Sequence, residues 1–248
     1  MKIAVVTQIR NESKRLREWI EFHHKFYNID LFSFYLDYPE DNSEEVVKEL
    51  SESYNIEYRF TSKKGHYNGN NCQSGTERQK ESFTDAFNRL KHEYDWIIIF
   101  DVDEWIVPVN IEEYDFRKWL RESDENALYL SMYNFTPPFD YSKSILDQNF
   151  HRWSAEERVS NGHGLTGKTI IRGKILLDKN PQVDIHCGPE IPEYMQGLDN
   201  IRMQEDFMYG RNDLFRIHQW QWHMVNSNKK YEEFDDSLRR MILGCKNQ

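Results

Sequence analysis

An acidic motif follows the most apolar segment of the chain. Asp101 and Asp103 come directly after the run from Trp96 to Phe100, and Glu104 is next. Acidic side chains at i and i+2 of an extended segment project to the same side, and burying carboxylates without partners is costly. Mg²⁺ or Mn²⁺ would remove that cost, because both ions prefer carboxylate oxygens together with substrate phosphates. A solvated turn at the end of a strand is the alternative.

A second polar group follows the first apolar run of the sequence. Arg10, Asn11 and Glu12 come after the run from Ile3 to Val6 and before a stripe of helical period. A helix N-terminus favours anionic groups, and an arginine there is suited to pairing with phosphate. Simple capping of the helix by Asn11 or Ser13 is the common alternative.

Three histidines are candidates for ligands or for structural hydrogen bonds. His23 lies on the apolar face of a predicted helix, so we assign it to the core. His186 and His218 each end a short predicted strand, where an imidazole can bind a metal ion or phosphate. Because two carboxylates cannot complete the octahedral shell that Mg²⁺ demands, we expect a histidine to contribute, with His218 the first choice and His186 the second. Hydrogen bonding within the core is the alternative for His218.

The elements that must position these groups alternate between strand and helix in the first hundred residues. Apolar runs predict strands at 3–6, 31–36 and 96–100, residues 56–60 are a further predicted strand, and helical stripes lie between the strands. This alternation predicts an α/β layer with a mainly parallel sheet, in which ligands bind beyond the carboxyl ends of the strands. We therefore expect one crevice beside the metal site, lined by Gln8, Arg10, Asn11 and Asp37.

The second half of the sequence is less regular. It predicts a helix at 112–121, a strand at 127–132, a strand or hairpin at 168–177, a strand at 215–223 and a closing helix at 231–243. No repeat or linker interrupts it, so we predict a single domain over residues 1–248.

Composition narrows the class of protein. The 248 residues carry 32 Lys and Arg against 42 Asp and Glu, a formal net charge of −10, whereas nucleic-acid binders normally show a basic face. Aromatic residues make up 15% of the chain and supply the area that a core needs. No apolar run is long enough for a transmembrane helix. The three cysteines form no CxxC pair, which favours a reducing, cytoplasmic compartment.

Taken in order, these motifs resemble the family-2-like and family-92-like glycosyltransferases. The similar pieces are Arg10-Asn11-Glu12 with Trp19 and His23 downstream, Gln79, Asp101-Val102-Asp103-Glu104, Gly167-Lys168-Thr169, Val183 to His186, and His218 with Ser227. The chain departs from the pattern at Tyr38-Pro39, where the family usually has Asn and a polar turn, and at Gln219, where it usually has Tyr.

The resemblance implies a GT-A fold, an α/β sandwich with a DxD metal site, and membership of an enzyme class that builds polysaccharides and other glycans. The implied activity moves a sugar from a nucleotide-sugar donor, UDP-linked, to an acceptor hydroxyl on a glycan or glycoconjugate, with inversion. The domain would then divide into a nucleotide-sugar-binding half, 1–108, and an acceptor-binding half, 109–248.

Site roles follow from the resemblance together with the motifs. The expected donor-binding residues are Gln8, Arg10, Asn11, Asp37, Gln79, Asp101 and Lys168. The expected ligands of Mn²⁺ or Mg²⁺ are Asp101, Asp103 and His218. Inversion needs a general base on the acceptor hydroxyl, and Asp206 and Glu190 are the candidates.

Two other classes of protein remain open on the residues alone. A metal-dependent phosphohydrolase or nucleotidyltransferase could use the same carboxylates. A non-catalytic carbohydrate-binding module could use the many Trp and Tyr rings to stack on sugars. A module of that kind would ignore both the nucleotide and Mn²⁺.

Overall fold

In a computed structural model the chain forms two compact units. Unit 1 comprises Met1–Val102, Asp115–Tyr129 and Lys168–Met203, and unit 2 comprises Asp103–Tyr114, Leu130–Gly167 and Gln204–Gln248. The structure describes residues 1–61, 72–108, 115–135, 143, 150–152, 167–177, 180–184, 188–189, 215–220 and 233–235. Within these ranges it describes only the backbone of residues 72–76, 129, 131–135, 150–152, 175–176, 184, 188–189, 215–220 and 233–235.

A mainly parallel sheet forms the centre of unit 1. Its strands are β1 (Ile3–Ile9), β2 (Leu31–Leu36), β3 (Ile56–Phe60), β4 (Trp96–Ile99) and β8 (Gly167–Arg172). They lie in the order β8-β4-β1-β2-β3, and β8 is antiparallel to β4 while the other pairs are parallel. The predicted α/β layer with a mainly parallel sheet is confirmed.

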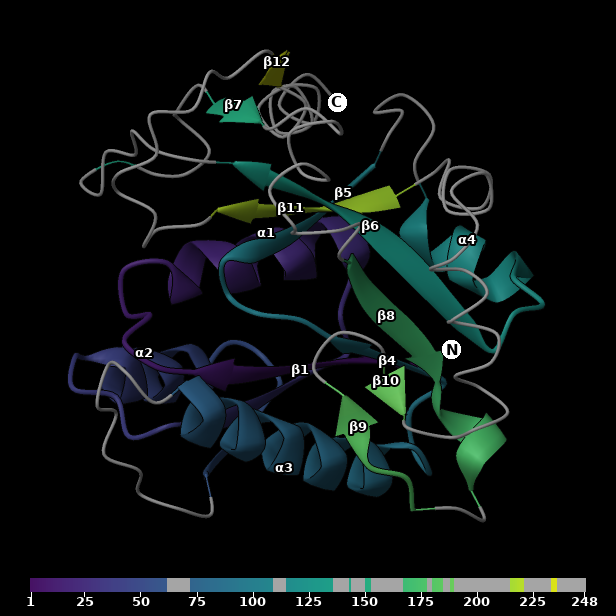
Figure 1. Cartoon of the computed structure of the whole chain (residues 1–248), viewed down its shortest axis with the longest axis horizontal. Coiled ribbons are helices and arrows are strands. Elements are labelled where there is room, and N and C mark those ends of the chain that lie inside the picture. The colour runs from purple at the N-terminus through teal and green to yellow at the C-terminus, as the bar shows by residue number, and fades with distance from the viewer. Residues whose placement is uncertain are drawn as a thin grey trace. The chain divides into compact units, whose positions relative to one another are not determined.

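Helices cover both faces of this sheet, which is why its central strands β4, β1 and β2 read as nearly continuous apolar runs. The helices of unit 1 are α1 (Leu16–Tyr27), α2 (Ser43–Leu50), α3 (Cys72–Leu90) and α4 (Phe116–Glu122), and Figure 1 shows α1 and α3 on opposite faces. Alternate residues of β1, Ala4 and Val6, share a buried cluster with Phe83 of α3. On the other face, the Trp19 ring of α1 lies 5.0 Å from the Phe100 ring, centroid to centroid.

His23 belongs to this second face. Its side chain is fully buried, and its Nδ1 lies 2.8 Å from the carbonyl oxygen of Trp19. Burial lowers the pKa of His23 to about 3, so the ring is neutral. The prediction that His23 is structural is confirmed.

Unit 2 is built on another set of paired strands. They are β5 (Glu104–Pro108), β6 (Ala127–Phe135, whose first residues belong to unit 1), β7 (Phe150–Arg152), β11 (Phe215–Trp220) and β12 (Glu233–Asp235). β11 pairs antiparallel with β5 and parallel with β6, while β7 pairs antiparallel with β6 and β12. Unit 1 also contains a short pair, β9 (Val183–Asp184) with β10 (Gly188–Pro189), and a 3-10 helix at Gly173–Leu176.

Three expectations about elements need correction. The closing helix predicted at 231–243 is wrong at Glu233–Asp235, which forms a strand because β7 offers a distant pairing partner. The first strand continues to Ile9, so Gln8 lies within it, opposite Tyr35 of β2. The strand predicted at 168–177 ends at Arg172, where the chain turns into the 3-10 helix.

Among the described residues, no helix is both long and apolar enough to cross a membrane.

Candidate active site

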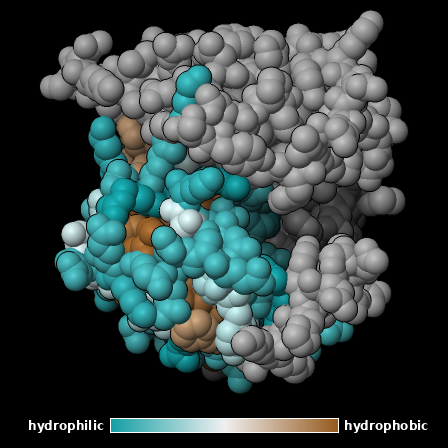
Figure 2. Space-filling model, turned by 90° about the vertical axis from the view of Figure 1, so that its left-hand side faces the viewer, coloured by the Kyte–Doolittle hydropathy of each residue, from teal (hydrophilic) through white to brown (hydrophobic). Residues whose placement is uncertain are grey.

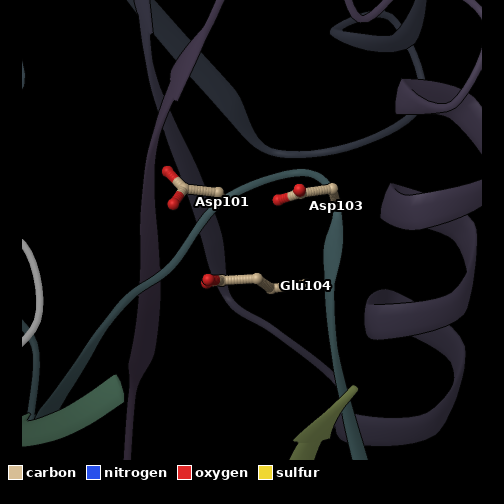
Figure 3. A group of neighbouring side chains, drawn as sticks. All are labelled: Asp101, Asp103 and Glu104. Carbon is tan, nitrogen blue, oxygen red and sulfur yellow. The ribbon is translucent and has the colours of Figure 1, made fainter. Parts of the chain in front are cut away.

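Three carboxylates gather in the contiguous segment that follows β4. Asp101, Asp103 and Glu104 each offer an oxygen, and these oxygens all lie within 4.8 Å of one another. Figure 3 shows the side chains of Asp103 and Glu104 projecting in the direction of Asp101. Glu104 is fully buried although the sequence analysis did not place it among the ligands. A set of hard oxygen donors this close fits Mg²⁺ or Mn²⁺.

Asp101 is held by two residues from other elements of unit 1. Gln79 of α3 donates from Nε2 to Oδ1 over 2.7 Å, and Lys168 of β8 donates from Nζ to Oδ2 over 3.0 Å. The Lys168 side chain is 2% exposed and that of Asp101 is 29% exposed. The lysine therefore supplies a buried positive charge beside Asp101. Three of the predicted donor-site residues are thus in contact.

A second cluster surrounds Asp37, which follows β2. Arg78 of α3 donates from Nε to Oδ1 over 2.8 Å and from Nη2 to Oδ2 over 2.9 Å, and the Thr61 hydroxyl donates to Oδ1 over 3.0 Å. Arg10 Nη1 lies 3.5 Å from Oδ2. Burial raises the pKa of Asp37, but the hydrogen bonds from Arg78 and Thr61 outweigh it, so the pKa lies below its usual value.

Sequence reasoning missed Arg78. No motif marks it, although it directly precedes Gln79 and so links the Asp37 cluster to Asp101 along α3. The one available signal was Asp37 itself, because a carboxylate expected at the end of a buried strand needs a cationic partner. Asp37 is 4% exposed and Arg10 is 26% exposed, so Arg10 is the group of this pair that can meet a ligand.

Hydrogen bonds join the loop after β1 to the loop after β2. Asn11, in the left-handed region at φ 55°, accepts at Oδ1 from the Glu40 N–H over 2.7 Å. The Ser43 hydroxyl accepts from the Glu12 N–H over 2.7 Å and donates to Asp41 Oδ1 over 2.5 Å. These bonds fix the loop that carries Arg10.

Capping does not explain the Arg10-Asn11-Glu12 motif. The N-cap residue of α1 is Arg15, and it makes no side-chain cap hydrogen bond. Asn11 is bonded to the neighbouring loop instead, and the Ser13 N–H donates to Asp41 Oδ2 over 3.0 Å. The alternative of helix capping by Asn11 or Ser13 is therefore wrong.

Glu12 is buried, and its pKa is affected by the charge of Asp101 in the acidic cluster. Burial raises its pKa to about 7, Arg15 lowers it, and the charges of Asp101 and Asp41 raise it further. Its Oε2 lies 3.2 Å from Arg15 Nη1, in a geometry that forms no hydrogen bond among the described residues. A carboxyl with a pKa near 7 exchanges its proton easily at neutral pH.

The structure describes the remaining predicted site residues only in part or not at all. Gln8 Oε1 is buried and accepts no hydrogen bond within the described ranges. His218 of β11 is paired with Trp105 of β5, and the next pair in the register is Gln219 with Glu104. The structure describes only the backbone of His218. The predicted general bases Asp206 and Glu190, and the second-choice ligand His186, lie outside the described residues.

Residues 3–242, nearly the whole chain, match the model of glycosyltransferase family 92. The chain belongs to glycosyltransferase family 92. This agrees with the resemblance drawn from the motifs at Arg10, Asp101 and Lys168. No curated protein matches the family 92 chain.

Solved structures similar to this family 92 chain share little sequence with it. S. aureus TarS 1–349 is 15% identical with a TM-score of 0.47, and the match covers 93% of this chain and 59% of that one. TarS 1–349 in complex with UDP-GlcNAc is 14% identical with a TM-score of 0.46, covering 96% and 60%. A mycobacterial protein is 10% identical with a TM-score of 0.40, covering 88% and 65%. The chain thus spans about three fifths of the length of the TarS 1–349 structures.

Proposed function

We propose that this family 92 chain is a metal-dependent glycosyltransferase of the GT-A type. It would transfer a sugar from a UDP-linked donor to a hydroxyl of a glycan or glycoconjugate, with inversion. The observation that carries the proposal is the cluster of Asp101, Asp103 and Glu104 at the carboxyl end of β4, because this is where an α/β sheet binds its ligand.

Asp101 and Asp103 would hold Mn²⁺ or Mg²⁺, and Glu104 is a third oxygen donor in reach. When bound, such an ion neutralises the charge that develops on a leaving diphosphate. Lys168 of β8 and Gln79 of α3 hold Asp101 in place by donating hydrogen bonds to its carboxylate. The ammonium of Lys168 also lowers the cost of gathering three carboxylates.

Arg10 supplies positive charge for the donor phosphates, and the buried Arg78 holds Asp37 in position beside it. Asp37 orients both guanidinium groups, and a guanidinium held in this way offers several N–H donors to phosphate oxygens. Gln8 and Asn11 complete the proposed donor crevice. The direct contact of Asp37 with the ribose or base stays a prediction.

Asp206 and Glu190 remain the candidates for the general base, and His218 for a further metal ligand. Asp206→Asn or Glu190→Gln should remove turnover while leaving donor binding intact, whichever residue is the base. His218→Ala should weaken Mn²⁺ binding in the presence of UDP, and His186→Ala is its matched control. Equal Mn²⁺ affinity in both histidine variants and the wild type would remove His218 from the site.

A screen of nucleotide sugars tests the function as a whole. Thermal stabilisation by a UDP-sugar in Mn²⁺, together with Mn²⁺-dependent release of UDP, is the expected result. Release of phosphate or pyrophosphate would instead indicate a phosphohydrolase or nucleotidyltransferase. Sugar binding that ignores both nucleotide and metal would indicate a carbohydrate-binding module.

A further inference from the structure

Two aromatic rings lie together at the carboxyl ends of β2 and β3. Tyr38 directly follows Asp37, and Phe60 is the last residue of β3, paired with Leu36. The ring centroids of Tyr38 and Phe60 are 5.6 Å apart and the rings are inclined by 37°. Phe60 is 43% exposed, one of few large hydrophobic side chains at the surface of the described residues. An aromatic pair therefore meets solvent at the edge of the sheet where ligands bind.

The backbone of Tyr38 is unusual for such a bulky residue. Its φ of 45° lies in the left-handed region, which Gly and Asn adopt with little strain and an aromatic residue does not. Backbone strain of this kind costs free energy, persists only where the surrounding structure fixes it, and is concentrated at ligand-binding and active sites.

The aromatic pair is joined to the charged cluster through Thr61. The Tyr38 hydroxyl donates to the carbonyl oxygen of Thr61 over 3.4 Å, and the Thr61 hydroxyl donates to Asp37 over 3.0 Å. Asp37 in turn holds Arg78 and Arg10. Aromatic faces beside guanidinium groups are the combination that recognises a nucleotide, because a base stacks on a ring while phosphate pairs with arginine.

The described surface beyond the carboxyl end of β1 is mainly polar. Figure 2 views the molecule from the side toward which β1 points in Figure 1, and hydrophilic residues dominate the described part of this face, with small hydrophobic patches among them. A single planar ligand matches the size of an aromatic pair.

We propose that Tyr38, supported by Phe60, is the stacking surface for the nucleobase of the donor. This inference rests on the proposed function, because it assigns the base-binding end of the same donor site. Stacking on a ring tolerates any base, so the pair would contribute affinity rather than choose between uracil and other bases.

The test compares UDP with inorganic pyrophosphate, which carries the two phosphates without a base. Tyr38→Asn deletes the ring while suiting the left-handed backbone, Tyr38→Phe keeps the ring, and Phe26→Ala removes a half-buried ring near the end of α1. Calorimetry with Mg²⁺ should show UDP affinity falling about tenfold or more in Tyr38→Asn. UDP affinity should stay near wild type in Tyr38→Phe and Phe26→Ala, and pyrophosphate affinity should not change in any variant.

Other outcomes of this experiment distinguish a failure of the stacking role of Tyr38 from a failure of the proposed function. If Tyr38→Asn binds UDP as tightly as the wild type, or loses UDP and pyrophosphate equally, the stacking role is wrong while the donor site stands. If the wild type binds pyrophosphate but not UDP, there is no base site and the stacking role is again wrong. If the wild type binds neither probe, the proposed function itself fails.

Discussion

The carboxylate of Asp37 lies between Arg78 and Arg10 with 4% of its side chain exposed. Its first task is to neutralise Arg78, whose side chain is 3% exposed and whose Nε lies 2.8 Å from Asp37 Oδ1. The sequence predicts Asp37 as a direct donor ligand, because a polar residue after a strand is visible in a sequence. The partner of that residue is not visible, since Arg78 is brought near by folding alone.

Asp37→Asn should destabilise the protein by roughly 3 kcal/mol, because removing one member of a buried ion pair leaves the other uncompensated. The folded-state pKa of Asp37 is lowered, so its charge stabilises the fold above its ordinary pKa of about 4 and that contribution is lost as the pH falls through the folded-state pKa. Urea unfolding at pH 7 and at pH 3 should therefore show a smaller difference between variant and wild type in acid. Asp124→Asn, at an exposed position, is the control and should change little at either pH.

The contribution of Glu12 to stability should depend on pH in the opposite sense to that of Asp37, and Glu12→Gln tests this. The pKa of Glu12 is raised to about 7, so the folded protein holds this proton more tightly than the unfolded chain does. Stability from Glu12 is then complete below its ordinary pKa and declines as the pH rises toward 7. In EDTA, the variant should lose less stability than the wild type between pH 4.5 and pH 8, by up to about 3 kcal/mol. Parallel melting curves for the two proteins across that range would contradict this.

At the scale of elements, the loop after β1 depends on the start of α2. Ser43→Ala removes the acceptor of the Glu12 N–H and a donor to Asp41, and should cost about 1–2 kcal/mol of stability. UDP binding should weaken as well, because the same loop carries Arg10. Ser51→Ala, which removes an exposed hydroxyl bonded to Lys48 at the other end of α2, should leave UDP binding unchanged.

The turn after β8 depends on a close backbone approach. A Cβ at Gly173 would lie 2.5 Å from the Tyr94 carbonyl oxygen and 3.0 Å from the Cα of Lys91. Gly173→Ala should therefore destabilise the protein by about 1–3 kcal/mol through displaced backbone, measured by chemical denaturation. Leu177→Ala, at a position 42% exposed in the same region, should have a much smaller effect. Equal stabilities of the two variants would show that the turn moves freely.

At the scale of the whole molecule, the sequence predicts best what depends on neighbours along the chain. β2 and β3 have the bounds that the sequence predicts, because polar turn residues flank both segments. The acidic motif was also visible, since Asp101 and Asp103 follow a strand directly. What escaped prediction depends on distant partners: the pairing of β12 with β7, the packing that stops β8 at Arg172, and the contact of Arg78 with Asp37.

The central claim is that the acidic segment after β4 binds a divalent ion together with a nucleotide donor, and calorimetry of UDP with and without Mn²⁺ tests it most directly. The wild type should bind UDP in Mn²⁺ and lose that binding in EDTA. Asp103→Ala should lose the Mn²⁺-linked binding while keeping the wild-type circular dichroism spectrum, because its side chain serves the ion rather than the core. UDP binding in Asp103→Ala that still rises with Mn²⁺ as in the wild type would contradict the account.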